Sequence, residues 1–201
     1  MSGTKEYIIE VASRVVHLRG FNHTSIGEIL KESGVGKGNF YYYFRSKEEL
    51  GYAIIENNFK RFSEEVTEKA FRNNRDAVAQ LDDFLNLLLN IHRKRNCAGG
   101  CRLGNMAMEM SDIHEGFRKK FQEVFDGWGV QVASALRKAQ ADGQLADHVD
   151  IPALAQFIIA SVEGAILLAK VKKDISILER CFEELKKYIW IYVNSSTPLR
   201  V

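Results

Sequence analysis

The fold is decided by residues Thr24 to Lys47, TSIGEILKESGVGKGNFYYYFRSK, whose pattern predicts two short helices around a tight turn. Thr24 is suited to be the N-cap of the first helix, which we expect from about Ser25 to Glu32. Gly34 can end this helix in the left-handed conformation, because glycine has no Cβ to clash there. A helix, a tight turn and a second helix together predict a helix-turn-helix.

The second predicted helix opens at Gly36 and Lys37 and has an inner and an outer face. Phe40 and Phe44 lie four residues apart and share the inner face. Tyrosine hydroxyls, an amide and a lysine are left for the outer face or its edges, where they suit phosphate oxygens and base edges in a DNA major groove. The sequence therefore predicts these DNA-binding residues: Thr24, Ser25, Gly36, Lys37, Gly38, Asn39, Tyr41, Tyr42, Tyr43 and Lys47.

A longer pattern runs through the same segment: T, I, a G-V turn, K-G, Y-x-Y-F and K-x-x-L. It lies at Thr24, Ile29, Gly34, Val35, Lys37, Gly38, Tyr41, Tyr43, Phe44, Lys47 and Leu50, with Ala12, Gly20 and Phe21 upstream. This pattern closely resembles the DNA-binding domain of the TetR family of bacterial transcriptional regulators. Gly36, Tyr42 and Gly51 depart from it, standing where the family usually has a small polar residue, a histidine and a larger residue.

The resemblance implies a small N-terminal DNA-binding domain followed by a larger helical domain. Residues 100–112, GCRLGNMAMEMSD, also resemble a shorter pattern of a family subgroup, G-C-x-x-G-N-x-A-x-E. We expect a helix-turn-helix domain at residues 1–50 and a ligand-binding and dimerisation domain at residues 51–201.

Composition and helical periodicity independently predict an all-α fold. The 201 residues are 46% hydrophobic and 27% charged, which is ordinary for a globular protein, and only two of them are prolines. Apolar spacing predicts about nine helices, at residues 4–18, 25–32, 36–44, 47–72, 77–95, 101–111, 113–141, 151–171 and 174–193, with a turn at 73–76 and a frayed tail at 194–201. The expected N-caps of the later helices are Ser46, Asp76, Asp112, Asp150 and Asp174.

Net charge and cysteine content limit which binding partners and which cell compartment we expect for this protein. The formal net charge is only +2, so DNA affinity would come from a local face rather than from a basic domain. The longest apolar stretch, around residues 154–171, is broken by Gln156, Glu163 and Lys170, and we expect neither export nor a membrane span. Three cysteines, an odd number, do not form a secreted disulfide framework, and we therefore expect a cytoplasmic protein.

A small-molecule effector is expected against the predicted helix at residues 101–111. A ligand site needs mostly apolar walls and a few placed polar groups, which Met, Phe and Trp side chains with Asn105 and Glu109 would supply. The alternative is that these side chains only pack the core, and that Glu163 lies at a dimer edge. The predicted ligand-binding residues are Phe84, Leu88, Cys101, Asn105, Met106, Glu109, Phe121, Trp128 and Glu163.

Cys97 and Cys101 lie four residues apart across a Gly-Gly turn, beside several cations. Because nearby cations lower the pKa of a thiol, a redox or electrophile sensor is an alternative function, although two ordinary thiols are favoured. His92, Cys97, Cys101 and His114 do not have a recognised zinc spacing, and no catalytic triad or carboxylate pair is visible. We predict no metal, no cofactor and no enzyme activity.

The last two long helices each carry an apolar stripe too wide for one core contact, so a second copy of the chain is expected to cover part of it. The predicted dimer-interface residues are Ile158, Val162, Ile166, Phe182, Ile189 and Trp190, with a monomeric core as the alternative. The sequence thus predicts a homodimeric repressor that binds a palindromic operator in double-stranded DNA and is released by a small molecule. A DNA-binding adaptor whose C-terminal domain only dimerises or docks a partner protein is the remaining alternative.

Overall fold

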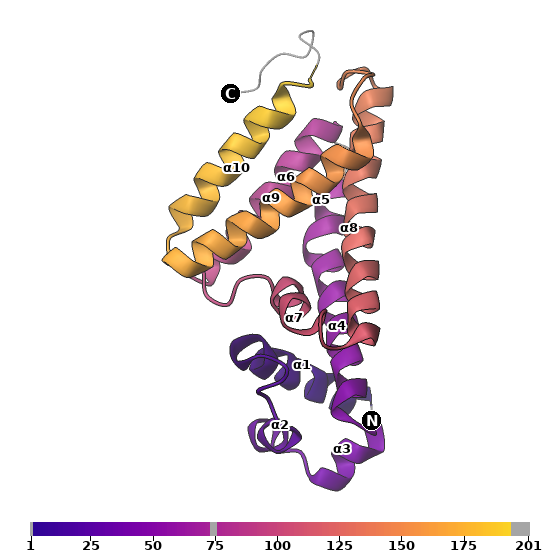
Figure 1. Ribbon diagram of the computed structural model, residues 1–201, viewed down its shortest axis with the longest axis vertical. Coiled ribbons are helices and arrows are strands. Elements are labelled where there is room, and N and C mark those ends of the chain that lie inside the picture. The colour runs from indigo at the N-terminus through magenta and orange to yellow at the C-terminus, as the bar shows by residue number, and fades with distance from the viewer. Residues whose placement is uncertain (1, 73–75, 194–201) are drawn as a thin grey trace. The chain divides into compact units, whose positions relative to one another are not determined.

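Figure 1 shows the structure, a computed structural model, which describes residues 2–72 and 76–193. Counted with α4, η1 and α5 as one helical run, the described residues form nine helices and no named strand, which confirms the predicted all-α fold. The predicted turn residues 73–75 and the tail 194–201 lie outside the described residues. The elements are α1 (Ser2–Arg19), α2 (Ile26–Ser33), α3 (Lys37–Tyr43), α4 (Lys47–Phe62), the π-helix η1 (Ser63–Thr67), α5 (Glu68–Phe71), α6 (Ala77–Lys94), α7 (Arg102–Met110), α8 (Glu115–Ala141), α9 (Ile151–Lys172) and α10 (Ile175–Trp190).

Local side-chain caps fix the starts of four helices as predicted. Ser46, Asp76, Asp150 and Asp174 each accept a hydrogen bond from a backbone N–H in the first turn of α4, α6, α9 and α10. A capped N–H no longer needs water, so each of these side chains stabilises its helix by about 1 kcal/mol.

The predicted start of α8 is wrong by two residues. Instead of a helix that begins at Ile113 behind an Asp112 cap, α8 begins at Glu115. The chain is still turning out of α7 at this point, because the His114 amide donates to the Met110 carbonyl at 2.9 Å. The ring nitrogen Nδ1 of His114 then accepts the Phe117 amide at 3.1 Å and takes the place of the expected aspartate cap.

The predicted helix at residues 47–72 is interrupted by the π-helix η1. The buried Thr67 hydroxyl donates to the carbonyl of Ser63, four residues earlier, at 3.1 Å. This side chain occupies the acceptor that the Thr67 amide would use in an α-helix, which favours the wider turn. Helix α4, η1 and α5 still follow one another without a loop.

The chain divides into two compact units. Unit 1 comprises Met1–Phe62 and Cys101–Val124, and unit 2 comprises Ser63–Gly100 and Phe125–Val201. Helix α7 and the start of α8 therefore pack with the helix-turn-helix, although they follow it by more than fifty residues in the chain. The division at residues 1–50 and 51–201 concerns function, which these units do not test, and it stays a prediction.

An aromatic cluster around Gly51 of α4 packs α8 against the rest of unit 1. Phe117 of α8 lies edge-on to Phe21, with ring centroids 5.2 Å apart, and edge-on to Tyr52 at 4.7 Å. A Cβ at Gly51 would lie 2.5 Å from the Phe117 ring and 2.9 Å from the Phe21 ring. Gly51, which departs from the family pattern, thus makes room for the two rings that join α8 to the segment before α2.

In unit 2, most of the predicted dimer-interface residues lie in the core of the single chain. Ile158, Val162, Ile166, Phe182 and Ile189 are buried within the single chain, and Trp190 is half-buried. The physical reason is that α9 packs against α10, and α10 also packs against α6. The buried members of the set therefore offer little surface to a second chain, and their role in an interface stays a prediction.

Helix α9 instead exposes a different apolar face. Phe157, Leu167, Leu168 and Val171 are each more than two-fifths exposed, and Tyr188 of α10 contacts Phe157, with ring centroids 4.9 Å apart. Among the described residues, α9 is the one helix whose length and composition would also suit a membrane span, but part of it is buried in unit 2. A helix with one buried and one exposed apolar face fits a core helix that also meets a partner.

Candidate nucleic-acid interface

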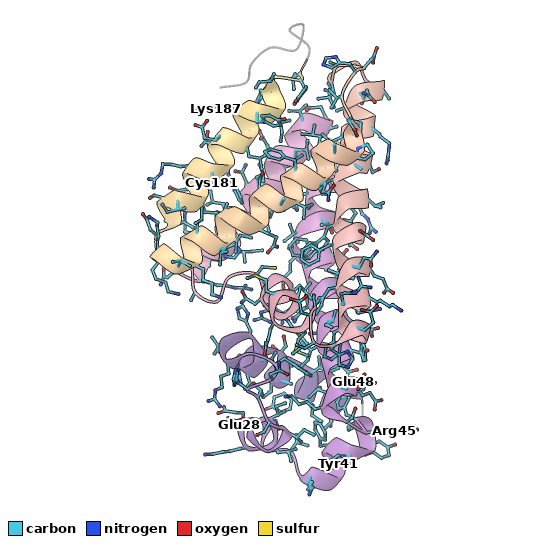
Figure 2. All side chains as sticks on the ribbon, in the orientation of Figure 1. Glu28, Tyr41, Arg45, Glu48, Cys181 and Lys187 are labelled. Atoms are coloured by element: carbon cyan, nitrogen blue, oxygen red, sulfur yellow. The ribbon has the colours of Figure 1, made fainter. Side chains whose placement is uncertain are left out.

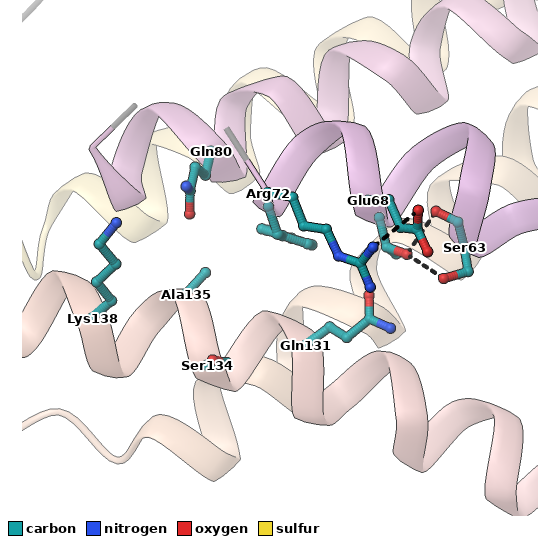
Figure 3. Close-up of a pocket in the computed structure, with 10 residues that line it drawn as sticks. Ser63, Glu68, Arg72, Gln80, Gln131, Ser134, Ala135 and Lys138 are labelled. Atoms are coloured by element: carbon teal, nitrogen blue, oxygen red, sulfur yellow. Dashed lines mark hydrogen bonds and ion pairs between the residues drawn. The ribbon is translucent and has the colours of Figure 1, made fainter. Parts of the chain in front are cut away.

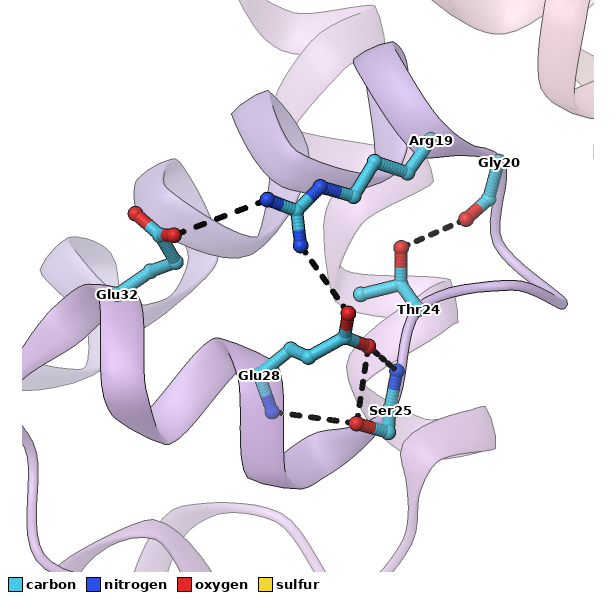
Figure 4. Close-up of polar contacts among 6 residues, drawn as sticks. All are labelled: Arg19, Gly20, Thr24, Ser25, Glu28 and Glu32. Atoms are coloured by element: carbon cyan, nitrogen blue, oxygen red, sulfur yellow. Dashed lines mark hydrogen bonds and ion pairs between the residues drawn. The ribbon is translucent and has the colours of Figure 1, made fainter.

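Helix α2 begins with a reciprocal cap at Ser25. The Ser25 hydroxyl accepts the Glu28 amide at 3.2 Å, and the Glu28 carboxylate accepts the Ser25 amide at 2.8 Å (Figure 4). Hydrogen bonds from Ser25, first its backbone N–H, lower the pKa of Glu28, which is further held by Arg19 at 3.1 Å. This capping box fixes the orientation of α2 before the turn.

Thr24, predicted as the cap and as a DNA contact, is not the cap in the structure, and its DNA contact stays a prediction. Its side chain is fully buried, and its hydroxyl donates to the Gly20 carbonyl at 2.7 Å (Figure 4). Ser25 has taken the capping position, because Glu28 stands three residues after it and completes the box. Thr24 therefore braces the turn before α2 from the inside.

The turn between α2 and α3 follows the prediction. Gly34 ends α2 with φ of 66°, the left-handed conformation that glycine favours. Gly36 is the N-cap of α3 and supplies no side-chain acceptor, so the first amides of α3 stay available to another acceptor.

Helix α3 has the two faces that the sequence predicts. Phe40 and Phe44 are buried, with ring centroids 5.6 Å apart. Tyr42 is 74% exposed and Tyr41 is 44% exposed, and Figure 2 shows Tyr41 on this short helix. The exposed residues from the predicted set are Ser25, Gly36, Lys37, Gly38, Asn39, Tyr41 and Tyr42, with Tyr43 half-buried beside them.

Lys47 is engaged within the protein. Its ammonium donates to the Asn22 carbonyl at 3.3 Å and lies 4.6 Å from the centroid of the Phe21 ring. Loss of solvent around this half-buried group lowers its pKa. Lys47 therefore supports the segment before α2, and its predicted role in DNA binding stays a prediction. The exposed cation at Arg45, directly after α3, was missed by the sequence prediction.

The predicted ligand-binding residues lie in both units. Cys101, Asn105, Met106, Glu109 and Phe121 belong to unit 1, whereas Phe84, Leu88, Trp128 and Glu163 belong to unit 2. The large apolar members of the set are buried, and the Cys101 sulfur accepts the Gly104 amide at 3.2 Å as the N-cap of α7. The Glu109 carboxylate accepts hydrogen bonds from unit 1 backbone amides. The ligand-binding role of the set stays a prediction.

Unit 2 contains a polar pocket of about 380 Å³ beside the π-helix (Figure 3). Its walls come from η1, α5, α6 and α8, and Figure 3 shows Arg72 and Gln80 on one side with Gln131 and Lys138 on the other. Arg72 pairs with Glu68 at 3.2 Å, which leaves Lys138 as an exposed cation at the rim. The lining residues are Ser63, Thr67, Glu68, Phe71, Arg72, Gln80, Gln131, Ser134, Ala135 and Lys138.

The cysteines and histidines do not form a metal site among the described residues, where no group of three or more potential ligands gathers. All three cysteines are free thiols, and burial raises the pKa of Cys97. A raised pKa reduces the thiolate fraction, which opposes the redox alternative at Cys97. Burial also lowers the pKa of His92 to about 4, so its imidazole is neutral at pH 7.

Two known protein families match this chain, one in its N-terminal part and one in its C-terminal part. Residues 8–54 match the family described as bacterial regulatory proteins, tetR family. Residues 77–185 match the family described as Tetracyclin repressor-like, C-terminal domain.

Individual relatives agree with the family matches. The chain is 33% identical over 186 residues to an uncharacterized HTH-type transcriptional regulator of Lactococcus lactis subsp. lactis, covering 92% of this chain and 93% of the relative. It is 34% identical over 155 residues to the transcriptional regulator AcuR of Cereibacter sphaeroides, covering 77% and 70%. A TetR transcriptional regulator structure from Chloroflexus aurantiacus superposes with a TM-score of 0.88 at 27% identity, covering 96% of both chains.

Proposed function

Because the chain belongs to the TetR family and is a DNA-binding transcriptional regulator, we propose that it is a homodimeric repressor that binds a palindromic operator and releases it when a small molecule binds. The observation that carries the proposal is the outer face of α3, where Lys37, Asn39 and Tyr42 are exposed while two phenylalanines lock the inner face. Such a face can enter a major groove while the fold remains intact. The motif at residues 100–112 supports a C-terminal domain of the G-C-x-x-G-N-x-A-x-E subgroup type.

Replacing Lys37 or Tyr42 by alanine is expected to weaken operator binding about 5- to 100-fold, because each change removes a phosphate or base contact. The melting temperature should stay nearly constant, since both side chains are exposed. Binding is measured by fluorescence anisotropy on a duplex selected from random DNA.

Two control variants sharpen this test. Lys94→Ala removes the same charge from an exposed position in unit 2 and should leave DNA affinity unchanged. Tyr42→Phe removes only the hydroxyl and separates a hydrogen bond from ring packing. Wild-type affinity in both alanine variants would show that α3 does not read DNA through this face.

A second copy of the chain is proposed to cover the exposed apolar face of α9 and α10. This face contains a pocket of about 590 Å³ lined by Phe157, Leu168, Leu185 and Tyr188 among others. Small residues at Ser161, Gly164 and Ala165 permit close approach of a partner helix. A two-fold dimer also carries two copies of α3, one for each half of a palindrome.

The pocket beside η1 supports the effector part of the proposal. Arg72 and Lys138 outnumber the single carboxylate of Glu68, and Gln80 and Gln131 add amide groups. This balance favours a small molecule that carries a carboxylate or a similar anion. Because η1 follows directly on α4, a ligand that changes the π-helical turn can change α4, which begins next to α3.

We expect a screen of small carboxylates to find a compound that raises the melting temperature and releases DNA. Coupling of about 1–3 kcal/mol would weaken operator affinity about 5- to 150-fold, and operator must weaken the compound's affinity by the same factor. Calorimetry with free and operator-bound protein measures this reciprocity.

Variants then locate the effector. Lys138→Ala should weaken binding of the compound, whereas the matched Lys94→Ala should not. If Trp128→Phe weakens binding and Lys138→Ala does not, the site predicted from the sequence is favoured instead. A screen in which no compound releases DNA would favour the adaptor alternative.

A further inference from the structure

Glu109, near the end of α7, binds the segment between α1 and α2 with both carboxylate oxygens. Oε2 accepts the Phe21 amide at 2.7 Å, and Oε1 accepts the Asn22 amide at 2.7 Å. These residues are separated by 88 and 87 positions in the sequence, yet all of them belong to unit 1. Hydrogen bonds to a charged acceptor are about twice as strong as neutral ones, so this pair is a firm attachment.

The peptide groups at Asn22 are held from two sides. Glu109 accepts from the Asn22 amide, and Lys47 of α4 donates to the Asn22 carbonyl at 3.3 Å. The negative charge of Glu109 also acts on Lys47, where it raises the pKa against the larger lowering from lost solvent. Helices α4 and α7 therefore fix the same short segment that leads into α2.

Gly20 gives the carboxylate room to approach. Its φ is +89°, and a Cβ at this position would lie 3.1 Å from both oxygens of Glu109. A side chain at residue 20 would thus be strained by the backbone and crowded by the carboxylate. The segment that contains Gly20 thus allows the Glu109 side chain of α7 to approach closely.

The start of α7 is hydrogen-bonded to α1, which in turn is hydrogen-bonded to α4. Arg102 donates to the Ser13 hydroxyl of α1 at 3.4 Å, and that hydroxyl donates to the buried Asn58 side chain of α4 at 2.8 Å. Helix α7 is therefore tied to α1 and α4 at one end and to the segment before α2 at the other. A helix attached at both ends is positioned to hold the orientation of α2 and α3.

We propose that Glu109 is a positioning residue for DNA binding, whose carboxylate fixes the segment before α2 so that α7 and the helix-turn-helix move as one body. The inference rests on the proposed DNA-binding function and deepens it. Glu109 itself needs no contact with DNA. Losing its two hydrogen bonds frees the Phe21 and Asn22 amides, and α3 is then presented to DNA in a wider range of orientations.

The test is Glu109→Gln, which has nearly the same shape but presents one oxygen and one N–H₂ group to two N–H donors. Operator affinity should fall at least tenfold while the variant remains a folded dimer. Amide exchange at Phe21 and Asn22, measured by NMR without DNA, should become at least tenfold faster. Glu115→Gln, an exposed carboxylate of α8 in the same unit, is the matched control and should change neither reading.

The proposal is overturned if the folded Glu109→Gln variant keeps wild-type affinity, or if its Phe21 and Asn22 amides exchange at the wild-type rate. If that variant does not fold, the same measurements on Glu109→Asp decide, with partial loss of affinity and of protection expected because the shorter side chain reaches only one amide well. Failure of the proposed function is distinguishable, since it would appear as no operator binding by the wild type. In that case the amide exchange rates, which need no DNA, still decide whether Glu109 holds the segment.

Discussion

Leu168→Glu is expected to convert the dimer into monomers and to lower operator affinity about 10²- to 10⁴-fold, because two half-sites are no longer held at once. Leu168 is 48% exposed on α9 and lines the apolar pocket of the proposed interface. A carboxylate there would have to lose its water on association, whereas it stays in water in the monomer. Light scattering measures the oligomeric state, and anisotropy on the selected duplex measures DNA affinity.

Two comparison variants make this prediction specific. Val130→Glu places the same charge on an exposed apolar residue of α8 and should leave a dimer with full affinity. Ile166→Glu should unfold the protein rather than dissociate it, because Ile166 is only 4% exposed within the single chain. A monomeric wild type, or a Leu168→Glu dimer with full DNA affinity, would refute the interface.

Phe44→Ala is expected to lower the free energy of unfolding by about 3–5 kcal/mol, the usual cost of removing a buried aromatic side chain. Phe44 is 1% exposed and packs against Phe40, so its loss leaves a cavity beneath α3. Urea denaturation followed by circular dichroism measures the change. Tyr42→Ala, on the opposite face of the same helix, should cost less than about 0.5 kcal/mol. Equal stabilities for the two variants would mean that the faces of α3 had been assigned in reverse.

The parts of the fold that depend on near neighbours were predictable from sequence. The helix-turn-helix was found because apolar spacing, Gly34 and the two phenylalanines all act within a few residues. The misplaced cap at Thr24 was avoidable, since Glu28 stands three residues after Ser25 and marks the capping box. Thr24 and Ser25 can both cap a helix, and Glu28 is what distinguishes Ser25.

The exposed apolar face of α9 was not predictable from periodicity. Helix α9 is apolar on two faces, so spacing alone does not tell whether Ile158 or Phe157 points into the chain. The packing of α10 against α9, which is a tertiary contact, covers one of these faces. The sequence therefore pointed to α9 and α10 but did not show which of their apolar side chains are exposed.

Two further features depend on side-chain hydrogen bonds that helical periodicity does not show. Glu109 belongs to a motif that the sequence linked with a ligand, but nothing local shows that its carboxylate meets amides 88 and 87 residues away. The π-helix depends on the Thr67 hydroxyl binding the Ser63 carbonyl, which helical periodicity does not register. The polar pocket beside it was not predicted, because its lining residues come from parts of the chain that are distant in the sequence.

The central claim, that a dimer reads DNA through the outer face of α3, is tested most directly by selecting duplexes from a random DNA pool with the purified protein. We predict one enriched palindrome whose half-sites are centred roughly one helical turn, or a multiple of it, apart, matching a pair of recognition helices. Its affinity should fall when Lys37 and Tyr42 are both replaced by alanine. Selection that enriches no sequence, or a palindrome that the double variant binds as tightly as the wild type, would contradict the claim.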